Sequence, residues 1–284
     1  MTVRRVAAIQ MTSGLDPAAN IAEAAALIRS AHAAGAELVV TPEMTTLLDR
    51  RRSRFLERLG EWPEERMAAP FAALAGELAI TLVVGSIPVL DRDGMRAFNR
   101  SVVFGPDGRE LARYDKIHLF DVDLGDGEIY HESGLFRPGR QAVVAATPAG
   151  RVGLSVCYDL RFPALYRALA MAGAGILTVP AAFTRPTGRA HWHALLRARA
   201  IETGSFVIAA AQTGRHQDGR ETFGHSLIVS PWGEVLGERI DEPGALIVEI
   251  DPKAVADARR RIPALDHGRE FVVVVKEAGA TSEC

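Results

Sequence analysis

Cysteine is almost missing from this sequence of 284 residues, which has only Cys157 and the final residue, Cys284. Two cysteines exclude a disulfide framework and fit a reducing compartment best. Long apolar runs are missing too: none reaches the length of a membrane span, and the apolar start is too short for a signal peptide. A net charge of −2 gives no electrostatic reason to bind nucleic acid or an anionic membrane. We therefore expect a soluble, cytoplasmic protein.

Lysine is the second scarce residue. The chain has 33 lysines and arginines together, but lysine occurs only at Lys116, Lys253 and Lys276. In a chain that otherwise uses arginine for surface charge, a remaining lysine indicates a position where an ammonium group is needed. Lys116, in Y-D-K-I-H-L-F, is therefore a candidate functional residue. A single lysine beside a strand is nevertheless most often a solvated charge.

Strand and helix patterns alternate along the chain. Helices are predicted at 16–34, 64–79 and 191–203, and short apolar runs bounded by turn residues are predicted to be strands. This order, with inserted hairpins, predicts an α/β fold with mixed sheets in a single domain over 1–284. R-V-A-A-I-Q-M and R-V-G-L-S-V-C have similar shapes, which suggests an internal repeat of sheet–helix halves.

Two segments lack a regular pattern. Residues 48–59 are rich in arginine and are predicted to form a mobile surface loop or a short helix, with the basic cluster from Arg50 to Arg54 as a solvated face. Residues 119–140 are rich in glycine and aspartate and are predicted to form a long ordered loop. A loop of that length inside a compact domain usually has a function.

The stretch R-V-G-L-S-V-C-Y-D-L-R-F-P, from Arg151 to Pro163, breaks sharply from a strand into a helix. Such a corner lifts Cys157 out of the sheet, near the positive end of the helix dipole, where a thiol loses its proton more easily. The alternative is that Cys157 is a small buried apolar side chain, which is the common role of a free cysteine. Taken alone the alternative is favoured, but the other motifs reverse that preference.

Glu43 follows an apolar run and a proline in T-P-E-M, so we expect it at the end of a buried strand, although most glutamates are solvated. Together with Lys116 and Cys157 it makes chemical sense. A carboxylate whose pKa is raised by burial can act as the base for a thiol nucleophile. An ammonium and a backbone N–H can stabilise the negative oxygen that forms when an amide is attacked. Residue spacing alone does not bring the three together.

The three motifs resemble a known set. T-P-E-M, Y-D-K-I-H-L-F-D and G-L-S-V-C-Y-D-L-R-F-P are similar to the signature motifs of the nitrilase, or carbon–nitrogen hydrolase, superfamily. The similarity continues through T-G-R-A-H-W-H-A-L-L-R-A-R-A-I-E-T and F-G-H-S-L-I-V-S-P-W-G-E-V and covers nearly the whole chain. These flanking segments most resemble the branch that contains deaminated-glutathione amidase and omega-amidase.

The resemblance implies a four-layer αββα sandwich with mixed sheets, usually assembled as a homodimer or a higher homo-oligomer. It implies a small carboxylated amide as the partner, and neither a metal nor an organic cofactor. The C-terminal tail, about 272–284, is expected to be exchanged between subunits or disordered.

The resemblance also implies a role for each motif residue. Cys157 is expected to be the nucleophile, Glu43 the general base, and Lys116 the group that stabilises the tetrahedral intermediate. The backbone N–H of Tyr158 is expected to complete the oxyanion site. A second glutamate of the family falls on Glu132, in H-E-S, where it would position Lys116 or the substrate.

Two positions leave alternatives open. Glu128 lies close to Glu132 in the same loop and could take its place. The family often has glutamate after R-F-P, and here Ala164 replaces it, so that a contact near the site is missing or is supplied elsewhere.

Three further residues match substrate-binding positions of the family. Arg161, four residues after the nucleophile, matches the arginine that binds a substrate carboxylate, and a guanidinium fork suits that task. Its alternative role is a structural ion pair with Asp159 or a neighbour. Phe183 and Thr187 match positions that line the pocket, although Phe183 could equally pack in the core.

The implied activity is that of a thiol amidohydrolase, which cuts the terminal amide C–N bond of a small carboxylated substrate and releases ammonia through a cysteine thioester. Deaminated glutathione is the preferred substrate, and omega-amides such as 2-oxoglutaramate come second. A carbamoylase or an aliphatic amidase follows, but Leu160 stands where a carbamoylase typically has a second arginine beside Arg161. The alternative outside the enzymes is a redox-sensing or interaction protein on the same fold, against which the intact triad argues.

Overall fold

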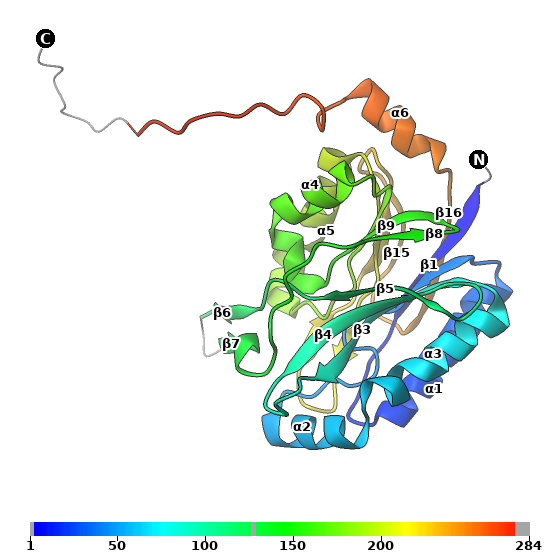
Figure 1. Ribbon diagram of the computed structural model, residues 1–284, viewed down its shortest axis with the longest axis vertical. Coiled ribbons are helices and arrows are strands. Elements are labelled where there is room, and N and C mark those ends of the chain that lie inside the picture. The colour runs from blue at the N-terminus through cyan, green and yellow to red at the C-terminus, as the bar shows by residue number, and fades with distance from the viewer. Residues whose placement is uncertain (1–2, 126–128, 276–284) are drawn as a thin grey trace, which may run out of the picture.

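The computed structural model describes residues 3–125 and 129–275, and most of its strands join two six-stranded sheets (Figure 1). From edge to edge, the first sheet consists of β16 (Gly244–Ile250), β1 (Arg4–Gln10), β2 (Leu38–Val40), β3 (Thr81–Leu90), β4 (Ala97–Phe104) and β5 (Glu110–Asp115). The second sheet consists of β15 (Val235–Arg239), β14 (Ser226–Val229), β11 (Phe206–Ala209), β10 (Ile176–Thr178), β9 (Gly150–Leu154) and β8 (Val144–Thr147).

The two sheets share one strand pattern. Each has three parallel strands at its centre, β1–β2–β3 in the first sheet and β9–β10–β11 in the second. An antiparallel strand flanks one side of each centre, and two antiparallel strands flank the other. The internal repeat that the similar β1 and β9 sequences suggest is therefore present in the fold.

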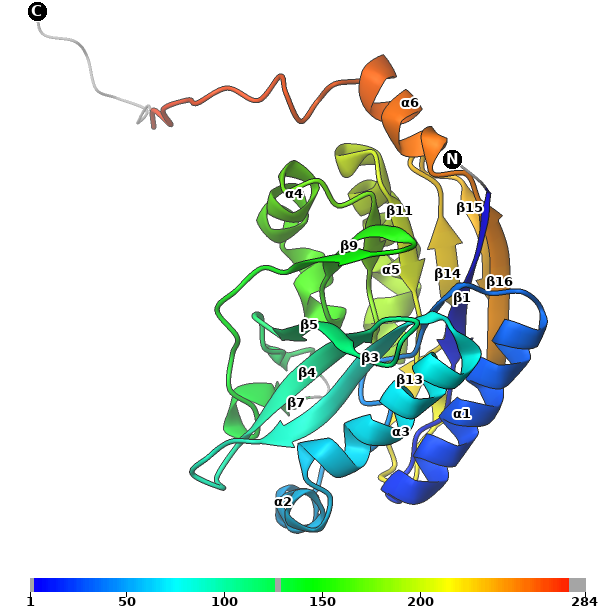
Figure 2. The same ribbon diagram turned by 45° about the vertical axis from the view of Figure 1, so that its right-hand side comes forward.

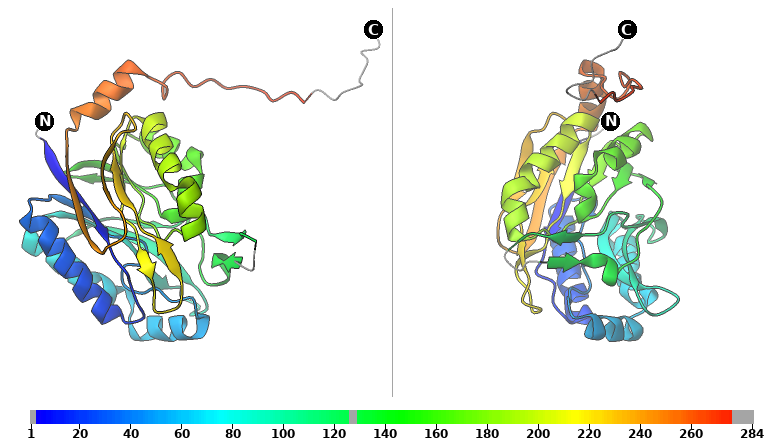
Figure 3. Two further views of the ribbon diagram at one scale, coloured as in Figure 1. Left: turned by 180° about the vertical axis from the view of Figure 1, so that it is seen from behind. Right: turned by 90° about the vertical axis from the view of Figure 1, so that its left-hand side faces the viewer.

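Helices cover the outer face of each sheet (Figures 2 and 3). The first sheet is covered by α1 (Pro17–Ala33) and α3 (Glu64–Leu78), and the second by α4 (Pro163–Met171) and α5 (Arg185–Thr203). The predicted four-layer αββα sandwich is confirmed. Within the described ranges, no helix is both long enough and apolar enough to cross a membrane.

Strand periodicity explains why two separate cores form. Successive residues of a strand point to opposite faces of the sheet. In β1, Val6 and Ala8 join the core between the two sheets, whereas Ala7 and Ile9 join the core beneath α1 and α3. Buried residues on both faces read as a nearly continuous apolar run, which is the pattern that predicted these strands.

The shorter elements occupy the connections. They are α2 (Arg52–Glu61), α6 (Lys253–Arg261), the pairs β6 (Asp121–Asp123) with β7 (Ile129–His131) and β12 (Thr213–Arg215) with β13 (Glu221–Phe223), and two 3₁₀ helices, η1 (Glu132–Gly134) and η2 (Cys157–Arg161). The arginine-rich segment is thus a helix for most of its length, and the predicted long loop contains β6, β7 and η1.

The helix predicted at 191–203 begins six residues earlier, at Arg185. The run T-R-P-T-G resembles a turn, but Pro186 lies in the first turn of α5, where its missing N–H costs no hydrogen bond. The first helix follows its prediction closely, because the Asp16 side chain accepts a hydrogen bond from the N–H of Ala18 at 2.9 Å and caps α1.

After α6 the chain runs away from the body as an extended segment (Figure 1). Its residues from Phe271 to Val275 are between 73% and 87% exposed. These five residues include the first part of the predicted tail; the remainder, 276–284, lies outside the described residues. An apolar F-V-V-V-V run with this much exposure is unusual for a water-facing surface.

Candidate functional site

The residues singled out in the three motifs meet at one place in the fold. Glu43 follows β2, Lys116 follows β5, and Cys157 follows β9 and opens η2. Glu132 opens η1 in the connection between β5 and β8. All four line the same cavity, which has a volume of about 1200 Å³. The candidate residues far apart in the sequence are therefore neighbours.

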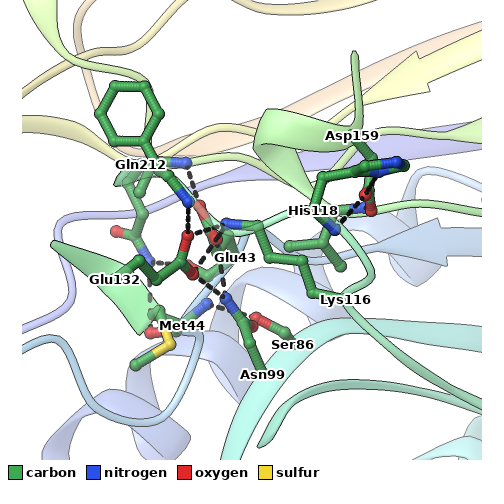
Figure 4. A network of polar contacts seen from close by, with 12 residues as sticks. Glu43, Met44, Ser86, Asn99, Lys116, His118, Glu132, Asp159 and Gln212 are labelled. Atoms are coloured by element: carbon green, nitrogen blue, oxygen red, sulfur yellow. Dashed lines mark hydrogen bonds and ion pairs between the residues drawn. The ribbon is translucent and has the colours of Figure 1, made fainter. Parts of the chain in front are cut away.

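The Lys116 ammonium lies between two carboxylates (Figure 4). Its Nζ is 3.0 Å from Glu43 Oε1 and 2.9 Å from each carboxylate oxygen of Glu132. The Lys116 side chain is 2% exposed, and those of the two glutamates are 6% and 13% exposed. Burial lowers the pKa of Lys116, but the charges of Glu132 and Glu43 outweigh burial and hold the pKa well above its usual value. Lys116 is therefore a permanent cation.

Glu43 is fixed through both of its carboxylate oxygens. Oε1 accepts hydrogen bonds from Lys116 and from Asn99 Nδ2, the latter at 2.8 Å, and Oε2 accepts one from the backbone N–H of Ala182 at 2.8 Å. The Cys157 thiol interacts with this carboxylate as well. Burial raises the pKa of Glu43, but the Lys116 ammonium and these hydrogen bonds bring it below its usual value. The expectation of a raised pKa at Glu43 is thus wrong, because burial does not act alone.

Cys157 stands at the predicted corner with a strained backbone. Its φ of 51° lies in the left-handed region, which non-glycine residues rarely adopt, and its N–H donates to the carbonyl oxygen of Pro180 at 2.8 Å. The residue is 8% exposed. Among the described residues, no hydrogen bond joins the N–H of Tyr158 to a backbone acceptor outside η2.

The Cys157 thiol is protonated in the resting site. Burial raises its pKa, the negative charge of Glu43 raises it further, and the lowering effect of Lys116 is smaller. The expectation that a helix start lowers this pKa is wrong for the resting protein, because a carboxylate in contact outweighs the dipole of a five-residue 3₁₀ helix.

Glu132 is the glutamate that contacts Lys116, and its Oε2 also accepts a hydrogen bond from the N–H of Phe120 at 2.6 Å. Burial raises the pKa of Glu132; Lys116 lowers it, Glu43 raises it, and the net shift is upward. Glu128, the alternative, lies outside the described residues. Ala164 is exposed in the first turn of α4.

Sequence reasoning missed several supporting residues. Asn99 in β4 bonds Glu43 and also approaches Glu132 Oε1 at 3.4 Å, while its own Oδ1 is buried without a partner among the described residues. Gln212 Nε2 donates to the backbone carbonyl of Glu43 at 2.9 Å (Figure 4). Gly85 leaves room for this loop, since a Cβ there would lie 1.9 Å from the carbonyl oxygen of Thr41. The only sequence signal for these supporting residues was an asparagine or a glutamine inside an apolar run.

The substrate-binding candidates differ in position. Phe183 and Thr187 line the cavity, and Phe183 also packs on Trp192 with ring centroids 4.8 Å apart. Arg161 is not among the lining residues; its guanidinium lies 5.6 Å from the Phe183 ring centroid and donates weakly to His191 Nδ1 at 3.3 Å. The alternative ion pair with Asp159 is absent among the described contacts.

Asp159 belongs instead to a buried network beside the site. It accepts hydrogen bonds from the Tyr114 hydroxyl at 2.6 Å and from the N–H of Val156 at 2.8 Å, and it contacts His118 Nδ1 at 2.7 Å. These bonds tie η2 to the segment after β5, which carries Lys116. The network therefore holds the Cys157 corner against the lysine strand.

One group outside the cavity has the composition of a metal site. His193, His225 and Glu238 place one ligand atom each within 4.8 Å of one another. Glu238 Oε1 is already hydrogen-bonded to His193 Nε2 at 2.8 Å and to His225 Nδ1 at 2.5 Å. None of the three residues lines the cavity. These contacts account for the group as a hydrogen-bonded link between α5, β15 and His225, the residue that precedes β14.

The family model for carbon-nitrogen hydrolases matches residues 5–260. The chain belongs to the carbon–nitrogen hydrolase family. It is 41% identical over 275 residues to a deaminated glutathione amidase of Synechocystis, covering 94% of this chain and 98% of that protein. It is 35% identical to the omega-amidase NIT2 of Homo sapiens, covering 97% and 99%.

A solved structure agrees with this membership. The C. elegans NitFhit protein matches with a TM-score of 0.89 and 34% identity, over 94% of this chain and 65% of that longer chain. The predicted family, the amidase reaction and the enzyme class are confirmed: this carbon–nitrogen hydrolase hydrolyses non-peptide amide bonds of small molecules.

The thiol pKa gives a direct test of the site's electrostatics. In a Cys284→Ser background, Glu43→Gln removes the charge that raises the pKa of Cys157, so the pH midpoint for alkylation of Cys157 by iodoacetamide is expected to fall. Rates are followed by mass spectrometry across pH. Glu57→Gln, on the exposed side of α2, is the control and should leave the midpoint unchanged. A midpoint that rises or stays in place after Glu43→Gln would contradict this account.

Proposed function

We propose that Cys157 is the nucleophile of this amidase and that Glu43 is its general base. The Cys157 sulfur forms a bond to the amide carbonyl carbon while the thiol proton passes to the neighbouring Glu43 carboxylate. Negative charge develops on the carbonyl oxygen. The Lys116 ammonium and the N–H of Tyr158 stabilise that charge. The observation that carries this proposal is a thiol beside a carboxylate that a buried ammonium keeps ionised.

The same groups complete the reaction. The C–N bond breaks as the proton on Glu43 passes to the leaving nitrogen, which leaves a thioester on Cys157. Glu43 then takes a proton from a water molecule whose oxygen attacks the thioester, and the sulfur departs and is reprotonated. Glu132 acts as a positioning residue for Lys116, since both of its oxygens lie 2.9 Å from Nζ.

Deaminated glutathione is the proposed substrate, and omega-amides such as 2-oxoglutaramate are the second candidate. The names of relatives at 35% to 41% identity support both. The cavity of about 1200 Å³ is large for a five-carbon acid, which favours the first. Deaminated glutathione has only secondary amides, so its hydrolysis yields 2-oxoglutarate and cysteinylglycine; ammonia is the second product only from the omega-amide.

Three residues complete the proposed substrate site. The positions of Phe183 and Thr187 on the cavity wall support a role in binding. Arg161 lies behind Phe183, so its role in binding a substrate carboxylate stays a prediction. A carbamoylase or an aliphatic amidase is the next alternative, and a non-enzymatic role on this fold is not proposed further.

The activity test uses the product that both candidate substrates share. Wild type is expected to form 2-oxoglutarate from deaminated glutathione and from 2-oxoglutaramate, with the higher kcat/KM for the first. Cys157→Ala is expected to lose at least about 1000-fold, because the step that forms the thioester is gone. Met171→Ala, exposed on α4, is the control. Full activity in Cys157→Ala, or no product from either substrate with wild type, rules out the proposal.

We also propose that the protein is a cytoplasmic homodimer in which the tail of each chain is covered by the other. The exposed run from Phe271 to Val275 supports this, because an unpaired strand-forming apolar segment is a site for strand addition. A second copy of the chain is always present at the same concentration as the first, and can cover this segment. The scarcity of cysteine supports a reducing compartment.

Truncation tests the assembly. The full chain is expected to elute with twice its 30.6 kDa mass in size-exclusion chromatography with light scattering. A chain ending at Glu270 is expected to shift toward the monomer or to a weaker dimer. Replacing the residues from Phe271 to Val275 by serine keeps the length and is expected to have the same effect. A full chain that is monomeric at all concentrations contradicts the proposal.

A further inference from the structure

The rim of the catalytic cavity has an unusual charge. Six arginines line the cavity, and two carboxylates accompany them besides the Glu43 and Glu132 pair. The arginines are Arg50, Arg52, Arg185, Arg189, Arg215 and Arg220, and the carboxylates are Asp49 and Glu221. The whole chain has a net charge of −2, so this local excess of cations does not follow from composition. A cavity lined by one sign of charge attracts ligands of the opposite sign.

Three of these arginines already have partners. Arg52 donates to the carbonyl oxygens of Gly134 and Met95, Arg185 lies 3.6 Å from Glu221, and Arg220 lies 3.5 Å from Asp218. In contrast, no partner is found for the guanidiniums of Arg50, Arg189 and Arg215 among the described residues, since only the backbone N–H of Arg50 bonds Asp218. Three guanidiniums with free donors therefore line a cavity in which a substrate must bind.

Two of these three arginines, Arg189 and Arg215, lie on elements that are fixed to each other. Arg189 lies in α5 and Arg215 in β12, which pairs with β13. The start of α5 packs closely on β13, since a Cβ on Gly188 would lie 2.3 Å from the Phe223 ring. The hairpin is in turn held by buried His216, whose ring nitrogens contact Ser13 O and Thr222 Oγ1, each at 2.8 Å. Rigid supports favour a preorganised binding site.

We propose that Arg189 and Arg215 form an anion subsite that binds the carboxylate of the substrate's leaving group. This inference rests on the proposed function and adds the part of the substrate that the rim recognises. The carboxylate of a departing cysteinylglycine lies about 7 Å from the scissile bond in an extended chain. Cys157 is a buried lining residue and both arginines are exposed, so an amide carbon at Cys157 leaves that carboxylate on the outer side, where the arginines lie. An omega-amide, whose leaving group is ammonia, has no carboxylate on the leaving-group side of the scissile bond.

The proposal predicts a selective loss. Arg189→Gln, Arg215→Gln and the double variant are assayed by 2-oxoglutarate formation from deaminated glutathione and from 2-oxoglutaramate. With deaminated glutathione, kcat/KM is expected to fall about tenfold to hundredfold, mainly through KM, because charge-assisted hydrogen bonds are lost. The effect with 2-oxoglutaramate, which shares the acyl part, is expected to be about ten times smaller. Arg109→Gln, an arginine with an 85% exposed side chain in a distant turn, is the control.

A neutral substrate isolates the interaction. Deaminated glutathione with its C-terminal carboxylate converted to an amide should be a poor substrate of wild type. The arginine substitutions should lower kcat/KM for this amide only slightly further. Equal losses with both acids, or no loss with deaminated glutathione, overturn the subsite while leaving the proposed function intact. Wild type that releases no 2-oxoglutarate from deaminated glutathione removes the proposed substrate and this inference together.

Discussion

A buried ammonium holds this site together. Taking the Lys116 charge out of water costs several kcal/mol, and only close carboxylates can offset that cost. Glu43 and Glu132 do so from two different connections, so the ends of β2 and β5 and the start of η1 must converge on one point. Removing one partner of such a buried pair typically costs about 3–5 kcal/mol, because it leaves an unpaired charge. The electrostatics of the site and the geometry of the fold therefore depend on each other.

The same cluster sets the chemistry of the thiol. Burial raises the pKa of Cys157 most, and the negative charge of Glu43 adds more than the Lys116 ammonium takes away, so the proton stays on sulfur in the resting state. A protonated thiol in contact with an ionised base is inert until an electrophile arrives. Two non-glycine residues with positive φ, Met44 and Cys157, stand beside this contact. Backbone strain of this kind persists where the surrounding structure enforces it.

The sequence contained the architecture and the chemical groups, but not their arrangement. The alternation of strand and helix patterns predicted the layers, and the cap at Asp16 predicted the start of the first helix, since both depend on local physics. The start of α5 was missed, because a proline in the first turn of a helix resembles a turn. Asn99 and Gln212 were missed because their contacts with Glu43 span 56 and 169 residues of sequence. The directions of the Glu43 and Cys157 pKa shifts depend on charges that only the fold brings near. The six arginines at the rim are likewise brought together only by the fold.

The protonation state of Cys157 before substrate binds is the central claim, and ultraviolet absorbance of the thiolate measures it most directly. The spectrum of the Cys284→Ser protein at neutral pH is compared with that of the same protein carrying Cys157→Ala. The account predicts no difference in thiolate absorbance at neutral pH, and a difference that grows only above the usual pKa of a thiol, about 8.5. A full thiolate signal at neutral pH would contradict it, because the sulfur would then hold no proton to give to Glu43.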